Sequence, residues 1–242
     1  MIDVKNILQA TNNQVEKNYS KIISLEHRKK FAQFFTPFQL ASLMADWLLG
    51  NQELKTVLEP AFGLGIFTRA LLSKKSDLLI KGFDIDETIL SEAKAIFSDF
   101  PNIELLLEDY MFNDWNNKYD GIICNPPYFK FHDYDNKIIL NEIENRLKIK
   151  LSGFTNLYTL FLLKSIYQLN SNGRLAYIIP SEFLNSDYGK LVKSALIKNK
   201  VLRHIVVFDF EENVFDDALT TACILLCSND KHNQKVKFTT IK

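Results

Sequence analysis

Four short apolar runs that alternate with helical patterns constrain the fold of this chain more than any other feature. The runs cover residues 56–58, 78–83, 103–107 and 121–124. Helical spacing of apolar residues follows at 68–74 and at 87–97. Parallel strands need crossover connections, which are usually helices, so this alternation predicts an α/β fold with a mostly parallel sheet and helices on both faces. In such a fold, ligands bind at the carboxyl ends of the strands.

The second half of the chain continues this pattern. Helices are predicted at 157–169 and 188–198, and strands at 174–179, 204–210 and 219–227. Only a short loop separates the last two strands, so they are expected to form an antiparallel hairpin at the edge of a seven-stranded sheet. Residues 129–153 are polar and aromatic, which predicts a loop with a helical portion at 138–147.

A chain of 242 residues, 47% of them hydrophobic, fits one globular domain. Residues 2–32 show helical spacing of apolar positions. We therefore expect residues 1–33 to form an N-terminal helical arm that packs on a main domain of residues 34–242. At the boundary, Thr36 is expected to cap a helix that Pro37 opens and that runs to about Leu49.

An acid stands at or directly after the end of each of the first three predicted strands: Glu59, Asp84 and Asp109. Asp84 is placed to accept hydrogen bonds from ribose hydroxyls. Asp109 could accept one from an adenine amine, with Ile85 and Tyr110 as apolar walls. Each acid alone is more often a solvated strand terminus. Together, at consecutive strand ends, the three acids predict a pocket for an adenosine group.

The loop after the first strand carries Gly63-Leu64-Gly65 and opens a helix. It lacks the third small residue of a dinucleotide-binding loop, because Thr68 stands at that position. Glu59, directly before the loop, would repel a pyrophosphate but suits a cationic amino-acid group. An adenosine that carries a charged amino acid is S-adenosylmethionine, which is the predicted cofactor.

The fourth strand ends in Asn125-Pro126-Pro127-Tyr128. Proline lacks an N–H and fixes its φ, so the strand ladder stops here and backbone carbonyls are available to a ligand. An amide side chain, a rigid carbonyl-bearing turn and an aromatic ring lie within four residues. This combination suits a planar group with an amine on its edge.

Charge and cysteine content narrow the range of partners and settings. The formal net charge is zero, which argues against strong nonspecific affinity for nucleic acid. The three cysteines lack the paired spacing of metal ligands, so we expect no metal site and a reducing, cytoplasmic setting. The longest apolar stretch, 157–169, is too short to span a bilayer, so no membrane is expected as a partner.

In their order along the chain, these motifs resemble those of the adenine-specific, amino-group DNA methyltransferases, and in particular the type II restriction-modification enzymes. The resemblance rests on Phe34-Phe35-Thr36-Pro37, Glu59-Pro60-Ala61-Phe62-Gly63-Leu64-Gly65, Asp84-Ile85-Asp86, Asp109-Tyr110, Asn125-Pro126-Pro127-Tyr128 and Asn213-Val214-Phe215. It implies a Rossmann-like S-adenosylmethionine-dependent methyltransferase fold. It also implies transfer of a methyl group to the N6 amine of an adenine flipped out of DNA.

The same resemblance implies a role for each matching residue. Thr36 and Glu59 would contact the methionine end of the cofactor, Asp84 its ribose, and Ile85, Asp109 and Tyr110 its adenine, with Ala61, Gly63, Gly65 and Asn125 completing the cofactor site. Asn125 and Pro126 would bind the target amine. Tyr128 and Phe215 would stack on the target base.

Enzymes of this type usually continue into a separate domain that recognises the target sequence, and no segment of residues 1–242 matches one. The chain is therefore expected to be the catalytic part of a restriction-modification enzyme, with DNA as substrate and a target-recognition domain or subunit for specificity. Two alternatives remain open. One is a methyltransferase acting on RNA adenine or on a protein glutamine amide, and the other is a noncatalytic cofactor-binding subunit.

Overall fold

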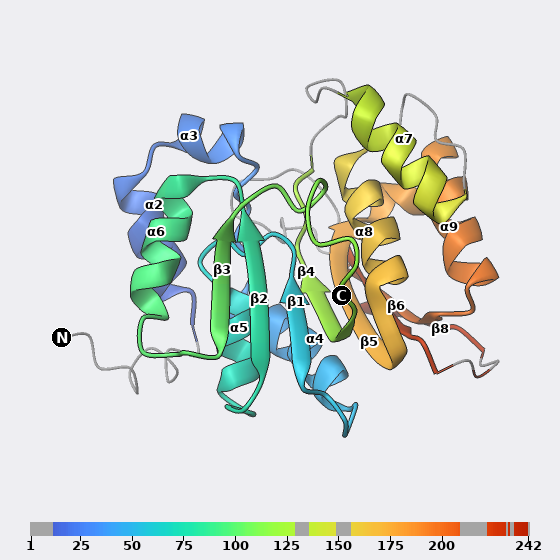
Figure 1. Ribbon diagram of the computed structural model, residues 1–242, viewed down its shortest axis with the longest axis horizontal. Helices are drawn as coiled ribbons and strands as arrows, with labels where there is room; N and C mark the ends of the chain where they lie inside the picture. The colour runs from blue at the N-terminus through green and yellow to red at the C-terminus, as the bar shows by residue number, and fades with distance from the viewer. Residues whose placement is uncertain are drawn as a thin grey trace.

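The computed structural model describes residues 12–128, 136–148, 156–208, 222–230, 232 and 235–241. Its described strands form one eight-stranded sheet in the order β3-β2-β1-β4-β5-β7-β6-β8 (Figure 1). The strands are β1 (Thr56–Glu59), β2 (Leu79–Asp84), β3 (Ile103–Leu107), β4 (Tyr119–Cys124), β5 (Leu169–Pro180), β6 (Leu202–Phe208), β7 (Ala222–Ser228) and β8 (Lys237–Ile241). Only β7 among them runs antiparallel to its neighbours. The predicted α/β fold with a mostly parallel sheet is confirmed.

The last three strands depart from the predicted edge hairpin. β6 and β7 pair antiparallel, with Val207 opposite Cys223, as expected. However, β7 lies between β5 and β6, and β8 pairs in parallel with the outer side of β6. The hairpin is therefore interior, and the described sheet has eight strands instead of seven. The sequence did not indicate β8, because four of its five side chains are exposed and it has no apolar face to mark it.

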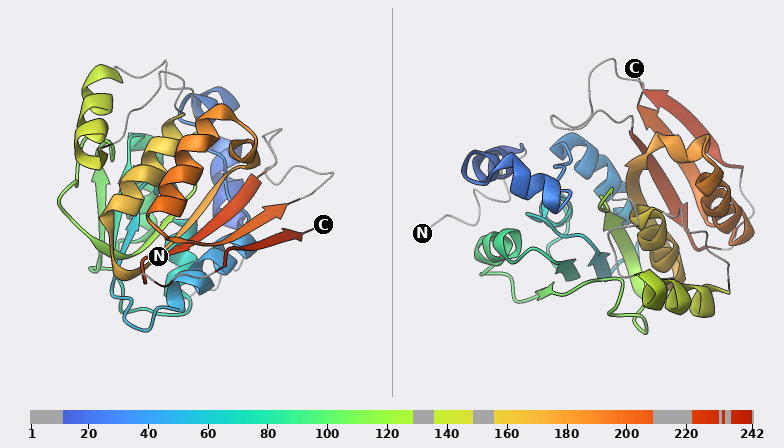
Figure 2. Two further views of the ribbon diagram at one scale, coloured as in Figure 1. Left: turned by 90° about the vertical axis from the view of Figure 1, so that its right-hand side faces the viewer. Right: turned by 90° about the horizontal axis from the view of Figure 1, so that it is seen from above.

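Helices cover both faces of the sheet (Figure 2). The described helices are α2 (Gln14–Ile22), α3 (Leu25–Lys30), α4 (Phe38–Leu49), α5 (Ile66–Leu72), α6 (Glu87–Ile96), α7 (Asn136–Leu147), α8 (Leu157–Gln168) and α9 (Asp187–Lys198), with a 3-10 turn at Ser181–Leu184. One apolar cluster joins α4, α5 and α6 to the sheet, and another joins α7, α8 and α9 to it. Successive residues of β4 serve the two clusters alternately: Ile123 packs in the first, and Ile122 and Cys124 in the second.

The described part of the N-terminal arm consists of two short helices, α2 and α3, beside α6 (Figure 1). Tyr19 of α2 packs in an apolar cluster with Leu64 and Ile89. Asn13, directly before α2, ties the arm to the start of α4. Its Nδ2 donates to the Thr36 carbonyl at 2.8 Å, and its Oδ1 accepts from the Phe38 N–H at 2.9 Å.

The capping role expected of Thr36 is wrong. Helix α4 begins at Phe38 after Pro37, with no side-chain cap from its N-cap residue, and Asn13 supplies the acceptor for the first free N–H. The Thr36 side chain is buried and faces a different partner, described below.

Two further observations concern the cysteines and the lengths of the helices. All three cysteines are buried without a disulfide. No helix in the described ranges is both long and apolar enough to cross a membrane.

Candidate active site

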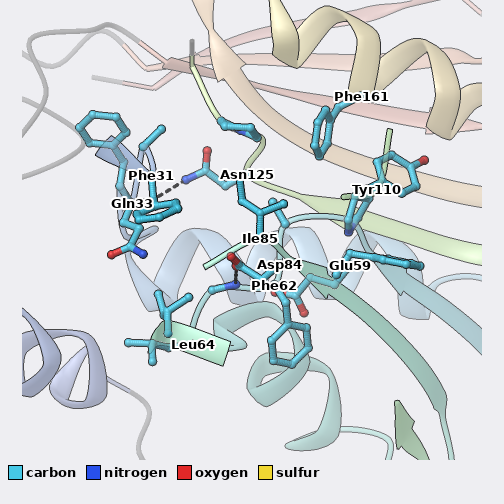
Figure 3. Close-up of a pocket in the computed structure, with 18 of the residues that line it drawn as sticks. Phe31, Gln33, Glu59, Phe62, Leu64, Asp84, Ile85, Tyr110, Asn125 and Phe161 are labelled. Atoms are coloured by element: carbon cyan, nitrogen blue, oxygen red, sulfur yellow. Dashed lines mark hydrogen bonds between the residues drawn. The ribbon is translucent and has the colours of Figure 1, made fainter. Parts of the chain in front are cut away.

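The predicted site residues gather at an open pocket at the carboxyl ends of β1, β2, β3 and β4 (Figure 3). Its empty volume is about 930 Å³, counting the part open to solvent, which is within the range of small-molecule sites. Nine of the predicted site residues line it, namely Thr36, Glu59, Ala61, Gly63, Asp84, Ile85, Asp109, Tyr110 and Asn125. The predicted residues Gly65, Pro126 and Tyr128 do not line it.

Glu59, the last residue of β1, is fully buried at the base of the pocket. One carboxylate oxygen, Oε2, accepts from the Thr68 hydroxyl at 2.7 Å and from the Thr68 N–H at 3.2 Å. The other oxygen, Oε1, has no hydrogen-bond partner among the described residues. Burial raises the pKa of Glu59 to about 8, although Thr68 and Arg69 oppose this shift. A cationic ligand group would supply the missing donor and favour the ionised form.

The loop from β1 to α5 is shaped by two glycines in the left-handed region, Gly63 at φ 55° and Gly65 at φ 70°. A Cβ on Gly65 would lie 2.5 Å from Phe97 and 2.7 Å from Phe62, so this position has no room for a larger residue. Gly65 therefore permits close packing beneath the loop. Helix α5 starts at Ile66, two residues earlier than the sequence predicted.

Asp84 fastens this loop to the end of β2. Its Oδ2 accepts from the Gly63 N–H at 2.9 Å (Figure 3). Its Oδ1 accepts from the Asp86 N–H at 3.0 Å. Burial raises the pKa of Asp84 to about 6, so the group is mostly ionised at neutral pH. The carboxylate thus lines the pocket while its backbone contacts hold it in place.

Apolar walls stand on either side of Asp84. Ile85 lines the pocket and is 50% exposed, so it presents an apolar surface to a ligand. A second apolar wall is formed by Tyr110 and Phe161, whose ring centroids are 5.1 Å apart. This wall lies across the pocket from Phe31 and Gln33 (Figure 3).

Buried polar contacts fix Tyr110 from behind. Its hydroxyl donates to Gln168 Oε1 at 2.5 Å and lies 3.1 Å from Ser165 Oγ. The buried Lys164 ammonium donates to the backbone carbonyls of Tyr110 and Asn113 and lies 3.9 Å from the Tyr110 ring centroid. Burial lowers the pKa of Lys164 to about 7. The turn after β3 is therefore rigid, and Asp109 contributes to it by accepting from the Met111 N–H at 2.8 Å.

Asn125, directly after β4, is oriented by the segment that precedes α4. Its Nδ2 donates to the Phe34 carbonyl at 2.9 Å and to Thr36 Oγ1 at 3.1 Å. A backbone carbonyl is only an acceptor, so the contact with Phe34 fixes which end of the amide is nitrogen. Both amide hydrogens are used, and the side-chain oxygen is left to accept from a ligand.

Tyr128 is held by contacts on several sides. Its hydroxyl donates to the Ile178 carbonyl at 3.1 Å. Its ring lies nearly parallel to that of Phe34, at 16° and 6.1 Å between centroids, and edge-on to Tyr158 at 6.2 Å. Pro126 is buried, and Pro127 lines the pocket. Phe215 lies outside the described residues.

Sequence reasoning missed several residues of the pocket. Leu157 and Phe161 reach it from α8, and their spacing of four was a detectable helical signal. Glu16 reaches it from the N-terminal arm and is buried. The signal for Glu16 was its place three residues before the apolar Tyr19, which puts an acid on the packed face of α2.

The sequence is similar to known methyltransferases. Residues 62–215 match the model of the Eco57I restriction-modification methylase family. The type II methyltransferase M.AccI of Acinetobacter calcoaceticus is 70% identical over 239 residues, which cover 99% of this chain and 44% of that protein. The chain thus spans less than half the length of this relative.

Solved structures share the fold. The methyltransferase subunit of a type I restriction-modification system from Streptococcus thermophilus has a TM-score of 0.75 and 20% identity, over 86% of this chain and 47% of that one. A candidate class I S-adenosylmethionine-dependent methyltransferase from Listeria monocytogenes has a TM-score of 0.73 and 18% identity, over 99% of this chain and 74% of that one. The fold is therefore that of the class I methyltransferases, and S-adenosylmethionine is the cofactor. With a family match over more than half of its length, the chain belongs to the Eco57I restriction-modification methylases.

Proposed function

We propose that this chain is the catalytic part of a type II restriction-modification methyltransferase that transfers a methyl group to the N6 amine of adenine in DNA. The orientation of Asn125 carries the proposal. Its amide nitrogen is bound to Phe34 and Thr36, so its oxygen is directed to accept a hydrogen bond at the pocket. The residues around the pocket also fit the cofactor, because Glu59 offers an unpaired buried oxygen and Ile85 an exposed apolar surface.

An exocyclic amine of adenine is a weak nucleophile because its lone pair is delocalised into the ring. When the Asn125 oxygen and the Pro126 carbonyl accept its two hydrogens, the nitrogen moves toward tetrahedral geometry and its lone pair becomes available. Bound S-adenosylmethionine supplies an electrophilic methyl group on a cationic sulfur. The nitrogen–carbon bond forms as the carbon–sulfur bond breaks, and the product nitrogen then releases a proton.

The chain's residues promote this step by position and by fixed dipoles. The hydrogen bonds to Phe34 and Thr36 hold the Asn125 side chain in one orientation before the target arrives. An asparagine also suits this place better than an aspartate, since a carboxylate would add charge beside the cationic sulfur and reduce its electrophilicity. No strong base is needed, because an N-methylated cation of this kind is acidic.

An adenine within a duplex is too deep in the stack to reach such a pocket, so the target base is flipped out. Stacking on Tyr128 offsets part of the unstacking cost, by about 1–3 kcal/mol on the scale of single-strand binding proteins. The hydrogen bond to Ile178 and the edge contact with Tyr158 fix the orientation of that ring. In this proposal Phe215 supplies a second stacking face.

DNA is the proposed substrate, and site selectivity is assigned to a target-recognition domain or subunit. The formal charge of zero supports this division, because a catalytic segment without excess positive charge holds DNA weakly by itself. The chain spans 44% of M.AccI, which leaves room in a protein of that length for a further domain. The proposed setting is the cytoplasm, in keeping with three buried cysteines that form no disulfide.

Incubation with methyl-labelled cofactor and with DNA, RNA or protein in parallel tests the proposal. We expect label in DNA, recovered as N6-methyladenine after digestion to nucleosides. The Asn125→Ala variant is the control and should transfer no label while still binding the cofactor. Label in RNA or in glutamine would favour the rival substrates. Cofactor binding without transfer to any substrate would favour a noncatalytic subunit.

A further inference from the structure

Glu16, in the first turn of α2, is a second buried carboxylate of the cofactor pocket. It is 2% exposed and lines the same pocket as Glu59, although it comes from the N-terminal arm. Its Oε1 accepts a hydrogen bond from Arg69 Nη2 of helix α5. Its Oε2 has no hydrogen-bond partner among the described residues, as is also the case for Glu59 Oε1.

The charges around these two acids do not balance. Arg69 is fully buried and lowers the pKa of both carboxyls, yet burial outweighs it, and both pKa values are raised. One guanidinium therefore serves two buried carboxyl groups, and the nearby charge of Asp84 also disfavours ionisation of Glu59. S-adenosylmethionine carries an ammonium, a sulfonium and a carboxylate, so its net charge of about +1 would offset the second negative charge when both acids ionise on binding.

We propose that Glu16 binds the α-ammonium group of the cofactor together with Glu59. An ammonium has three N–H donors, enough for both unpaired oxygens. The two acids then share one ligand cation, while Arg69 keeps Glu16 in place. This inference depends on S-adenosylmethionine being the cofactor and is independent of which substrate receives the methyl group.

The anchoring of the arm supports this role. Asn13 binds both the Thr36 carbonyl and the Phe38 N–H, which fixes the first turn of α2 against the segment that orients Asn125. Tyr19 packs in one apolar cluster with Leu64, which belongs to the loop from β1 to α5. Glu16 is therefore held at the pocket by contacts on both ends of the helix, and it need not move to meet a ligand.

The test compares two ligands by titration calorimetry with the full chain. One is S-adenosylhomocysteine, and the other is its analogue without the α-ammonium group. The Glu16→Gln variant should bind S-adenosylhomocysteine about tenfold more weakly, since a charge-assisted hydrogen bond is lost. Its affinity for the analogue should change less than twofold. Glu26→Gln, an exposed acid in the first turn of α3, is the matched control and should alter neither affinity.

The ratio of the two affinities distinguishes the loss of a contact with the ligand from damage to the fold, because misfolding would weaken the binding of both ligands equally. A double variant, Glu16→Gln with Arg69→Met, removes both buried charges and should show the same change in ratio if the single variant is unstable. Equal loss for both ligands, or no loss, would overturn the inference. So would a wild-type chain that binds neither ligand, whereas binding without methylation of DNA would count only against the proposed function.

Discussion

Binding of S-adenosylmethionine should expel a proton from Glu59 at neutral pH. Burial raises the pKa of Glu59 to about 8, so at pH 7 roughly 0.9 of the cofactor-free molecules carry this proton. In the complex the carboxylate faces a cationic group and is ionised. The α-ammonium of the cofactor, with a pKa near 8, takes up about 0.1 proton on binding. The expected net release from Glu59 and the cofactor at pH 7 is therefore about 0.8 proton, and any proton carried by the buried Glu16 would add to it.

The sign of the pH dependence follows from this release. The affinity for the cofactor should rise from pH 6.5 towards 8, because the free-energy cost of deprotonating Glu59 falls. It should decrease above pH 8, as the cofactor loses its own ammonium proton. Burial raises the pKa of Asp84 to about 6, so this acid affects the pH dependence of cofactor binding mainly below pH 6.5. Arg69 acts in the opposite direction on Glu59 and is already counted in its pKa.

Titration calorimetry in two buffers of different ionisation enthalpy measures the number of protons directly. The Glu59→Gln variant keeps the shape of the side chain but has no proton to release, so its net release should be about 0.9 proton lower than that of the wild type. Exposed Glu26→Gln should behave as wild type. A wild-type chain that binds the cofactor at pH 7 without releasing a proton would refute the reasoning, as would an unchanged release in Glu59→Gln.

Three further predictions concern the site and its loop. Asp84→Ala should weaken cofactor binding at least about tenfold, because it removes the acceptor for the Gly63 N–H as well as the carboxylate; a normal dissociation constant in calorimetry would exclude it from the pocket. Gly65→Ala should lower the free energy of unfolding by about 1–3 kcal/mol more than Gly63→Ala in denaturant titrations, since only the Gly65 Cβ collides with Phe62 and Phe97. Asn125→Ala should abolish methyl transfer and change cofactor affinity less than about threefold; equal loss of both would contradict its role as a ligand of the target amine.

The strand ends that form the pocket were readable from the sequence because each of the first four apolar runs stops at an acid or an amide. Glu59, Asp84 and Asn125 could be placed at one edge by the geometry of a parallel sheet alone, and Asp109 follows the third strand in the same way. The pKa of Glu59 could not be predicted, because it depends on the complete burial of the carboxyl group, which arises only in the folded chain.

Long-range pairing accounts for what the sequence did not reveal. Thr36 looked like a helix cap, but its hydroxyl accepts from Asn125, 89 positions away. Helix α4 receives its cap from Asn13 instead, 25 positions earlier. The interior position of β7 depends on its pairing with β5, and β8 has no apolar face that would indicate a strand. In each case the local sequence favoured a different structure, and contacts between distant parts of the chain determined the observed one.

The order of elements along the chain has a consequence for how the protein is made. Apart from Leu157 and Phe161, the described residues that line the pocket all lie between Glu16 and Pro127. By contrast, β5 cannot complete its pairing until Ser228 at the far end of β7 has been synthesised, because Arg174 lies opposite that residue. Contacts between distant segments form slowly, and domains fold as the chain emerges from its amino end. The strand ends that form most of the pocket are therefore synthesised well before the remaining half of the sheet can pair.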